Sequence, residues 1–195
     1  MKQIWKIDHD HSELMIQVRY LTITTISATI KNYDLSLTTE DNTFSSTSMI
    51  AFKASASAIK TNSPKMDEHL YSPDFFNAAA HQFITFEGEN FDKGVIQRGQ
   101  GFLHYISNEH SIDGEITIKN ITRPITLKMF YNGTVTDHHG KTIAGFKVSG
   151  KLLRSDFDMN WGGNTITGKL ILGDEVTIDG NIQLVKQEQN DIVPA

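Results

Sequence analysis

Residues 176–184 read VTIDGNIQL, and in this segment apolar side chains alternate with polar ones. The same period of two recurs in residues 13–20, ELMIQVRY, and in residues 111–119, SIDGEITIK. Successive side chains of a strand point to opposite faces, so each segment has one apolar face and one wet face. This pattern is typical of antiparallel strands that pack one face on a core. The chain is therefore predicted to be all-β.

Turn signals separate the alternating segments. They stand at Asp92-Lys93-Gly94, at residues 137–140, DHHG, and at residues 161–164, WGGN. Residues 94–135 are expected to form three consecutive strands joined by short connections. Many evenly spaced antiparallel strands predict a closed barrel or a sandwich, and periodicity alone does not choose between them.

The connection at residues 62–80 departs from the strand pattern. Ser72-Pro73-Asp74 predicts the start of a helix, because Ser suits the N-cap, Pro the first helical position and Asp the positive end of the helix dipole. Short helices are therefore expected around residues 63–80. Phe75 and Phe76 follow at once and need an apolar surface, which the mouth or flank of a sheet structure would supply.

Length and composition bound the protein class. A chain of 195 residues suits one domain, expected over residues 1–187 with a polar tail at 188–195. The formal net charge is −5 and no basic stripe occurs, so no nucleic-acid partner is expected. The absence of cysteine excludes disulfides and thiol chemistry.

The sequence shows no run of transmembrane length and no signal-peptide pattern at its start. No transmembrane segment is therefore expected. A cytoplasmic location is expected, or a periplasmic one if a leader has been removed from the chain.

Metal and catalytic chemistry have little support. On a strand, His9 and His11 would point the same way and could chelate a metal, but nothing fixes a third ligand; residues 8–12 could equally form a turn with a hydrogen-bonded His. Asp67-Glu68-His69 could form an acid–base cluster at a barrel mouth, or solvated charge on a helical turn. Nucleophile-elbow, phosphate-loop and zinc-protease motifs are absent. No metal site and no enzymatic activity are predicted.

An ordered set of motifs resembles the YceI-like family of polyisoprenoid-binding proteins. The motifs are Trp5, Ile7, Asp8, His11 and Ser12; His69-Leu70 with Asp74-Phe75-Phe76; residues 117–127, TIKNITRPITL; Arg154-Ser155-Asp156-Phe157 with Met159 and Trp161; and residues 173–178, GDEVTI. The resemblance runs from about Trp5 to Leu184. The chain departs from the family pattern at Tyr20, where a His is common, and at Asn120 and Asp158, where glycines are frequent.

The resemblance implies a lipocalin-like antiparallel β-barrel that holds a long isoprenoid lipid, either a polyprenyl phosphate or an isoprenoid quinone. It also implies a homodimer, and a role in carriage, storage or sequestration with no cofactor besides the lipid. Three alanines on one face of residues 49–58, together with Gly99 and Gly101, favour a hollow interior over close packing. A barrel of about eight strands can be filled by side chains or can hold one small ligand.

The inward faces supply the candidate ligand-binding residues. They are Leu14, Ile16, Val18 and Tyr20, then Phe52, Ala54 and Ala56, and then Phe76, Phe83, Phe102 and Arg154. Phe83 and Phe86 fall on opposite faces, so one of them is expected to pack elsewhere. Arg154 either pairs with Asp156 to close a barrel end or holds an anionic or carbonyl head group.

Three other functions stay open from the sequence. A stress-related barrel could bind a protein partner through an exposed apolar face. A small-molecule enzyme could use the Asp67-Glu68-His69 cluster. A filled interior would leave a structural protein without a ligand.

Overall fold

The computed structural model describes residues 2–40, 44, 49–93, 109–168 and 170–188. The predicted positions Gly94, Gly99, Gly101 and Phe102 lie outside the described residues, as does most of the predicted tail.

The described chain consists mainly of strands. The strands are β1 (Gln3–Ile7), β2 (Glu13–Tyr20), β3 (Thr24–Ile30), β4 (Tyr33–Thr39), β5 (Met49–Ser55), β6 (Ile59–Lys60), β7 (Phe83–Lys93), β8 (Glu109–Ile118), β9 (Ile121–Thr136), β10 (Thr142–Leu153) and β11 (Leu172–Lys186). The helical elements are the α-helix α1 (Pro64–Tyr71) and the 3₁₀ turns η1 (His9–His11), η2 (Ala56–Ala58) and η3 (Arg154–Phe157).

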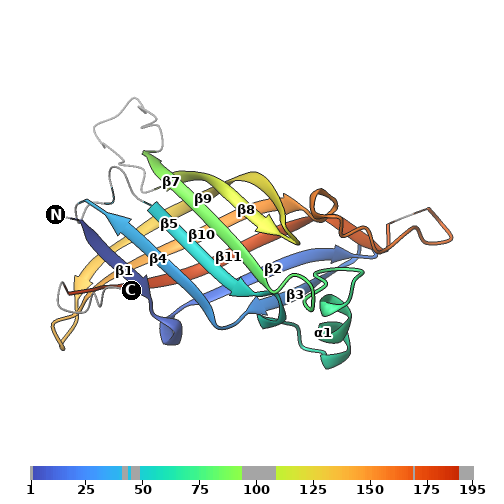
Figure 1. Ribbon diagram of the computed structural model, residues 1–195, viewed down its shortest axis with the longest axis horizontal. Coiled ribbons are helices and arrows are strands. Elements are labelled where there is room, and N and C mark those ends of the chain that lie inside the picture. The colour runs from blue at the N-terminus through green and yellow to red at the C-terminus, as the bar shows by residue number, and fades with distance from the viewer. Residues whose placement is uncertain (1, 41–43, 45–48, 94–108, 169, 189–195) are drawn as a thin grey trace.

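The strands form a closed antiparallel barrel (Figure 1). Its eight-strand ring runs β1-β4-β5-β7-β8-β9-β10-β11, and β11 returns to β1. The long β11 pairs with β1 through residues 184–186 and with β2 through residues 172–181. The periodicity alone allowed either a closed barrel or a sandwich. Closure of this ring confirms the barrel.

Three neighbouring strands of the barrel are each broken into two segments. β1 continues as β2 after η1, β3 continues as β4 after Asn32, and β5 continues as β6 after η2. Asn32 takes the left-handed backbone conformation at φ 49°, which bends the chain between two extended segments. On one side of the breaks β1 pairs with β4 and β4 with β5. On the other side β2 pairs with β3 and β3 with β6, in the same order.

The three breaks lie side by side in the barrel wall. The His9 ring in η1 meets the Tyr33 ring edge-on at 5.3 Å, just beyond Asn32. The Lys31 N–H donates to the Ala58 carbonyl of η2 at 2.9 Å. We call this aligned set of breaks, residues 8–12, 31–32 and 56–58, the crease.

The crease corrects one strand prediction. The alternation of residues 49–58 predicts one strand, but β5 ends at Ser55. The Ser55 hydroxyl accepts a hydrogen bond from the Ser57 N–H at 3.3 Å and caps η2. Ala56 therefore lies in a turn and has no place in the strand alternation.

The helix of the 63–80 connection is confirmed, but its predicted start is wrong. α1 begins after Ser63, with Pro64 in the first turn, and ends at Tyr71, with Ser72 as its C-cap. The Ser72 hydroxyl donates to the His69 carbonyl at 2.7 Å, so Ser72 caps the C-terminal end of a helix instead of starting one. Residues 73–80 follow as hydrogen-bonded turns, and they carry Phe75 and Phe76 into the core.

The end of the barrel away from α1 is closed by aromatic rings. Phe44 packs against Trp5 at 5.0 Å, Phe146 at 5.1 Å and Tyr131 at 5.3 Å between ring centroids. The Trp5 Nε1 donates to the Thr39 hydroxyl at 3.2 Å, and both residues are fully buried. This cluster removes the interior from solvent at that end.

A glycine pair holds one ring of the inner wall. Gly88 and Gly114 face each other across β7 and β8, and the Phe86 ring lies against both of them. A Cβ on Gly114 would overlap the Glu87 backbone carbonyl oxygen and would stand 2.6 Å from the Phe86 ring. The glycines therefore make room for Phe86.

We expect Gly114→Ala to lower the free energy of unfolding by about 1–3 kcal/mol, because the added methyl group must displace the Phe86 ring. Urea titration followed by tryptophan fluorescence measures this change. Gly145→Ala is the matched control, since its Cβ would meet Asn132 at an ordinary 3.6 Å. Equal destabilisation by both variants would contradict this account of Gly114.

Candidate functional site

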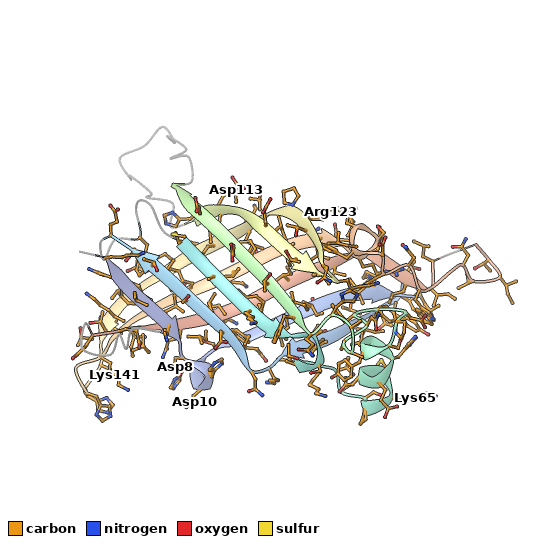
Figure 2. The ribbon with its side chains drawn as sticks, viewed as in Figure 1. Asp8, Asp10, Lys65, Asp113, Arg123 and Lys141 are labelled. Atoms are coloured by element: carbon orange, nitrogen blue, oxygen red, sulfur yellow. The ribbon has the colours of Figure 1, made fainter. Side chains whose placement is uncertain are left out.

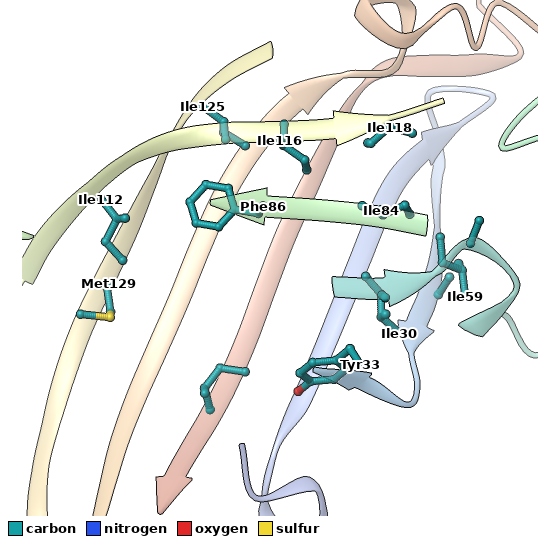
Figure 3. Packing of buried hydrophobic residues seen from close by; sticks show 14 of the residues in the cluster. Ile30, Tyr33, Ile59, Ile84, Phe86, Ile112, Ile116, Ile118, Ile125 and Met129 are labelled. Carbon is teal, nitrogen blue, oxygen red and sulfur yellow. The ribbon is translucent and has the colours of Figure 1, made fainter. Parts of the chain in front are cut away.

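The interior of the barrel holds an apolar cavity of about 550 Å³. It is lined almost entirely by aliphatic and aromatic side chains from the inner faces of the strands and from the 64–76 segment. Figure 3 shows several of these side chains, including Ile84, Phe86 and Ile116, pointing into the same interior. The side chains from the surrounding walls leave the middle of the barrel empty.

Most of the predicted ligand-binding residues line this cavity. They are Leu14, Ile16, Val18 and Tyr20 of β2, Phe52 of β5, Phe76 after α1, and Arg154. The whole apolar face of β2 thus turns inward, as its alternation predicts. Whether these side chains touch a ligand stays a prediction.

Three predicted residues do not line the cavity. Ala54 is buried on the inner face, but its larger register partners Tyr33 and Ile84 form the wall there. Ala56 is buried within η2. Phe83 lies on the outer face of β7, 48% exposed, with the Lys53 ammonium 4.0 Å above its ring.

Phe86, the second ring of the 83–86 segment, takes the inward position instead. The two rings fall on opposite faces, as the strand alternation predicts. The prediction that Phe83 is the inward ring is wrong. Phe102 lies outside the described residues.

Sequence reasoning omitted a large part of the wall although the signal was present. Ile112, Ile116 and Ile118 of β8 line the cavity, as do Ile178 and Ile182 of β11. Both strands show the same alternation as β2. Assigning every alternating apolar face to the interior would have found these residues.

The cavity reaches the surface beside Trp161, which lines it and is 38% exposed. The His69 ring packs edge-on against Trp161 at 4.8 Å and against Phe75 at 5.0 Å. His69 Nε2 is hydrogen-bonded to Asp74 at 3.0 Å, which fixes the orientation of the imidazole. Aromatic side chains from two distant segments thus frame the mouth.

Arg154 fastens the wall beside the mouth. Its Nε donates to the Gly173 carbonyl at 2.8 Å, its Nη2 to Leu172 at 3.2 Å, and its Nη1 to the carbonyls of Trp161 and Met159. Burial of the guanidinium lowers the pKa of Arg154, and the nearby Asp174 carboxylate opposes that shift. A planar fork with several donors suits such convergent carbonyls.

The predicted Arg154–Asp156 pair does not form. Asp156 is exposed, and in the described residues the guanidinium is held by backbone carbonyls. The carboxylate near this site is Asp174, which accepts from the Ser155 N–H at 3.0 Å and from the Ser155 hydroxyl at 2.7 Å. Arg154 therefore holds the wall together, as the structural alternative predicts, but it does so through backbone carbonyls and not through Asp156.

We expect Arg154→Met to lower the free energy of unfolding by at least about 2 kcal/mol, because several buried carbonyls lose their donor at once. Asp156→Asn is the control and should change it by less than about 0.5 kcal/mol, as for most exposed sites. Thermal and urea unfolding measure both variants. A larger loss of unfolding free energy in Asp156→Asn would contradict this account and support an Arg154–Asp156 pair.

The Tyr33 side chain lines the cavity, but its hydroxyl oxygen is buried within the wall. The residue is 4% exposed, and its oxygen has no hydrogen-bond partner among the described residues. Burial raises the pKa of Tyr33 to about 12, so the hydroxyl is neutral at ordinary pH. A neutral, unpartnered hydroxyl is a donor for a neutral oxygen atom.

The predicted acid–base cluster is not assembled. Asp67 is buried and accepts from the Thr61 N–H at 2.7 Å and the Thr61 hydroxyl at 2.8 Å. Glu68 is exposed, and His69 turns to Asp74. The three side chains face different directions from one helical turn, so they do not share a substrate position.

Asp67 ties α1 to the chain that precedes it. Burial alone would raise the pKa of Asp67, but the hydrogen bonds from Thr61 and the charge of Lys60, 3.8 Å away, outweigh it and lower the pKa below its usual value. The ionised carboxylate therefore stabilises the fold above the ordinary Asp pKa. That contribution is lost as the pH falls through the depressed value.

We expect the free energy of unfolding of the parent protein to fall more steeply between about pH 5 and pH 2 than that of Asp67→Asn, because only the parent loses this carboxylate. Urea titrations at a series of pH values give both slopes. Glu68→Gln, an exposed neighbour, should follow the parent curve. Parallel curves for the parent and Asp67→Asn would contradict this role.

His9 and His11 lie in the 3₁₀ turn η1 and not on a strand, so their side chains are not aligned as the metal-binding alternative requires. The Asp8 carboxylate is hydrogen-bonded to His11 Nδ1 at 3.0 Å, and His9 packs on Tyr33. This is the alternative in which a turn holds a hydrogen-bonded His. Within the part of the chain that the structure describes, no three His, Asp or Glu side chains gather as metal ligands would.

Comparison with known proteins identifies the family to which this barrel belongs. The family model described as the YceI-like domain matches residues 5–184. The chain belongs to the YceI-like family. The family resemblance predicted from the motifs between Trp5 and Leu184 is thereby confirmed.

Curated relatives are similar over nearly the whole length. A UPF0312 protein of Staphylococcus epidermidis is 26% identical over 184 residues, covering 92% of this chain and 95% of the relative. A UPF0312 protein of Staphylococcus aureus is 26% identical over 181 residues, covering 90% and 94%.

Solved structures share the fold. Burkholderia cenocepacia BcnA matches with a TM-score of 0.70 at 15% identity, over 91% of this chain and 98% of that one. The Campylobacter jejuni YCEI protein matches with 0.68 at 22%, over 87% and 90%. A Saccharophagus degradans domain described as polyisoprenoid-binding matches with 0.63 at 8%, over 94% and 98%.

Two family-level departures fit the backbone of this chain. Asn120 and Asp158, which replace frequent glycines, have φ of 61° and 55°. This left-handed region favours glycine, and Asn and Asp tolerate it better than most residues. Among the described residues, no helix has the length and apolar character needed to cross a membrane.

Proposed function

We propose that this protein binds a long-chain isoprenoid lipid, with the tail in the barrel cavity, for carriage, storage or sequestration. The observation that carries the proposal is the 550 Å³ apolar cavity, closed at one end by aromatic rings and open at the Trp161 mouth. The polyisoprenoid-binding description of the Saccharophagus degradans domain supports the same ligand class.

The hydrophobic effect supplies enough free energy for such binding. Apolar transfer contributes about 0.8 kcal/mol per buried CH₂, so a tail of roughly twenty carbons offers about 16 kcal/mol before any cost. Ordering of the tail and loss of free motion offset much of this gain. Tail length and width would then decide selectivity more than the head group.

Two head groups are candidates, a polyprenyl phosphate and a quinone ring. The guanidinium of Arg154 already donates to four carbonyls, which supports a position for a charged phosphate in water outside the mouth. A neutral quinone ring would instead lie among the apolar side chains that line the cavity. We further propose a homodimer as the assembly, as the family resemblance implies.

A plugged barrel tests the proposal. Ala28 of β3 lines the cavity opposite Ile16, and we expect Ala28→Trp to fill the space and reduce lipid loading to less than about a tenth. Ala51→Trp is the matched control, because Ala51 is exposed on the outer face of β5. Organic extraction and lipid mass spectrometry of each purified protein, before and after incubation with polyprenols or quinones, measure the loading.

Equal loading of the two folded variants would place any lipid outside the cavity. A parent protein that neither carries nor takes up lipid would overturn the proposed function. Circular dichroism of each variant confirms that the barrel is intact before loading is compared.

A further inference from the structure

We propose that residues 161–172 form a membrane-docking hairpin, which holds the cavity mouth against an anionic bilayer while the lipid passes between membrane and barrel. This inference rests on the proposed lipid-binding function and adds to it the surface from which the ligand enters.

The hairpin is attached to the cavity at both of its ends. Trp161 lines the cavity where the chain leaves the wall, and Leu172 lines it where the chain returns. Between them, the Ile171 N–H donates to the Gly163 carbonyl at 2.9 Å, and Asn164 bridges to Leu170. Figure 1 shows this segment projecting beyond the end of β2, past the rest of the barrel.

The projecting part carries large apolar side chains in water. Ile166 is fully exposed at 108%, and Leu170 is 50% exposed. Ile23, in the neighbouring β2–β3 turn, is 76% exposed. The Leu21 N–H of that turn donates to the Ile171 carbonyl at 2.7 Å, so turn and hairpin form one apolar tip beside Trp161.

The charge of the tip suits an anionic membrane surface. Residues 159–173 contain no acidic residue, in a chain of net charge −5. Arg19 adds a guanidinium beside the tip, where it donates to the Thr22 carbonyl at 2.9 Å. An anionic bilayer attracts such basic groups and would repel most of the remaining surface, which orients the mouth toward the lipid.

A bilayer fits the tip better than a protein partner. A specific protein interface buries about 800 Å² on each partner and needs a complementary shape. A few apolar side chains on a narrow hairpin do not form such a face, but they can enter the disordered boundary between head groups and acyl chains. Tryptophan is enriched at that boundary, where Trp161 would lie.

Flotation with vesicles tests the proposal. The probes are vesicles of phosphatidylcholine and phosphatidylglycerol in a ratio of about seven to three, which supplies the anionic surface that the argument requires. We expect the full chain to float with them, and the double variant Ile166→Ser/Leu170→Ser to lose vesicle affinity by at least about tenfold. Neither residue lines the cavity.

Val135→Ser is the matched control. Val135 is 64% exposed on β9, near the 137–140 turn. In Figure 2, Lys141, which follows that turn, is labelled on the left and Lys65 of α1 on the right. This variant should float like the parent. Equal vesicle affinity of parent and double variant, or no flotation of the parent, would overturn the docking proposal.

Lipid transfer separates the docking proposal from the proposed function. The double variant should take up polyprenol from vesicles at least about tenfold more slowly than the parent, but should reach equal loading from ethanol-dispersed polyprenol. A parent that takes up lipid from neither source refutes the lipid-binding function, while flotation still reports docking. A double variant that changes the subunit count in native mass spectra, without parent flotation, would assign the hairpin to a contact between copies and overturn docking.

Discussion

The barrel depends on one shared edge, that of β11. Its hydrogen-bonding groups are divided between β1 near its C-terminal end and β2 along the rest, so a strand of 15 residues is covered by two shorter ones. Closure through this edge leaves the ring without a free strand. It also directs the apolar faces of the described strands to one interior, where they are removed from water on folding.

The interior is hollow for a different reason from the one the sequence indicated. The alanines of residues 49–58 predicted open space, but larger residues form the wall beside them, as Tyr33 and Ile84 do on either side of Ala54. Aromatic rings close the end around Phe44 and also frame the mouth at Trp161. The cavity lies between these two ring clusters and is lined by both aliphatic and aromatic side chains.

The fold and much of the wall could be predicted because they follow from local periodicity. Alternation in residues 13–20 fixes which side chains of β2 face inward, and no distant contact is needed to know it. What failed depended on contacts across the chain. Arg154 takes its partners from carbonyls up to 19 residues away, and Ser72 ends a helix because its hydroxyl meets the His69 carbonyl. The choice between Phe83 and Phe86 depended on the register of β7 in the closed barrel.

The crease has a consequence for how the barrel opens. At residues 8–12, 31–32 and 56–58 three adjacent ladders are interrupted together, whereas β11 runs unbroken past them. We therefore expect the segments β2, β3 and β6, with α1 beyond them, to open separately from β1, β4 and β5. Backbone amide protons of β2, β3 and β6 can then exchange with solvent through local opening, while the backbone amides around the Phe44 cluster stay protected. The barrel can thus open locally at its mouth while the end closed by the Phe44 cluster stays folded.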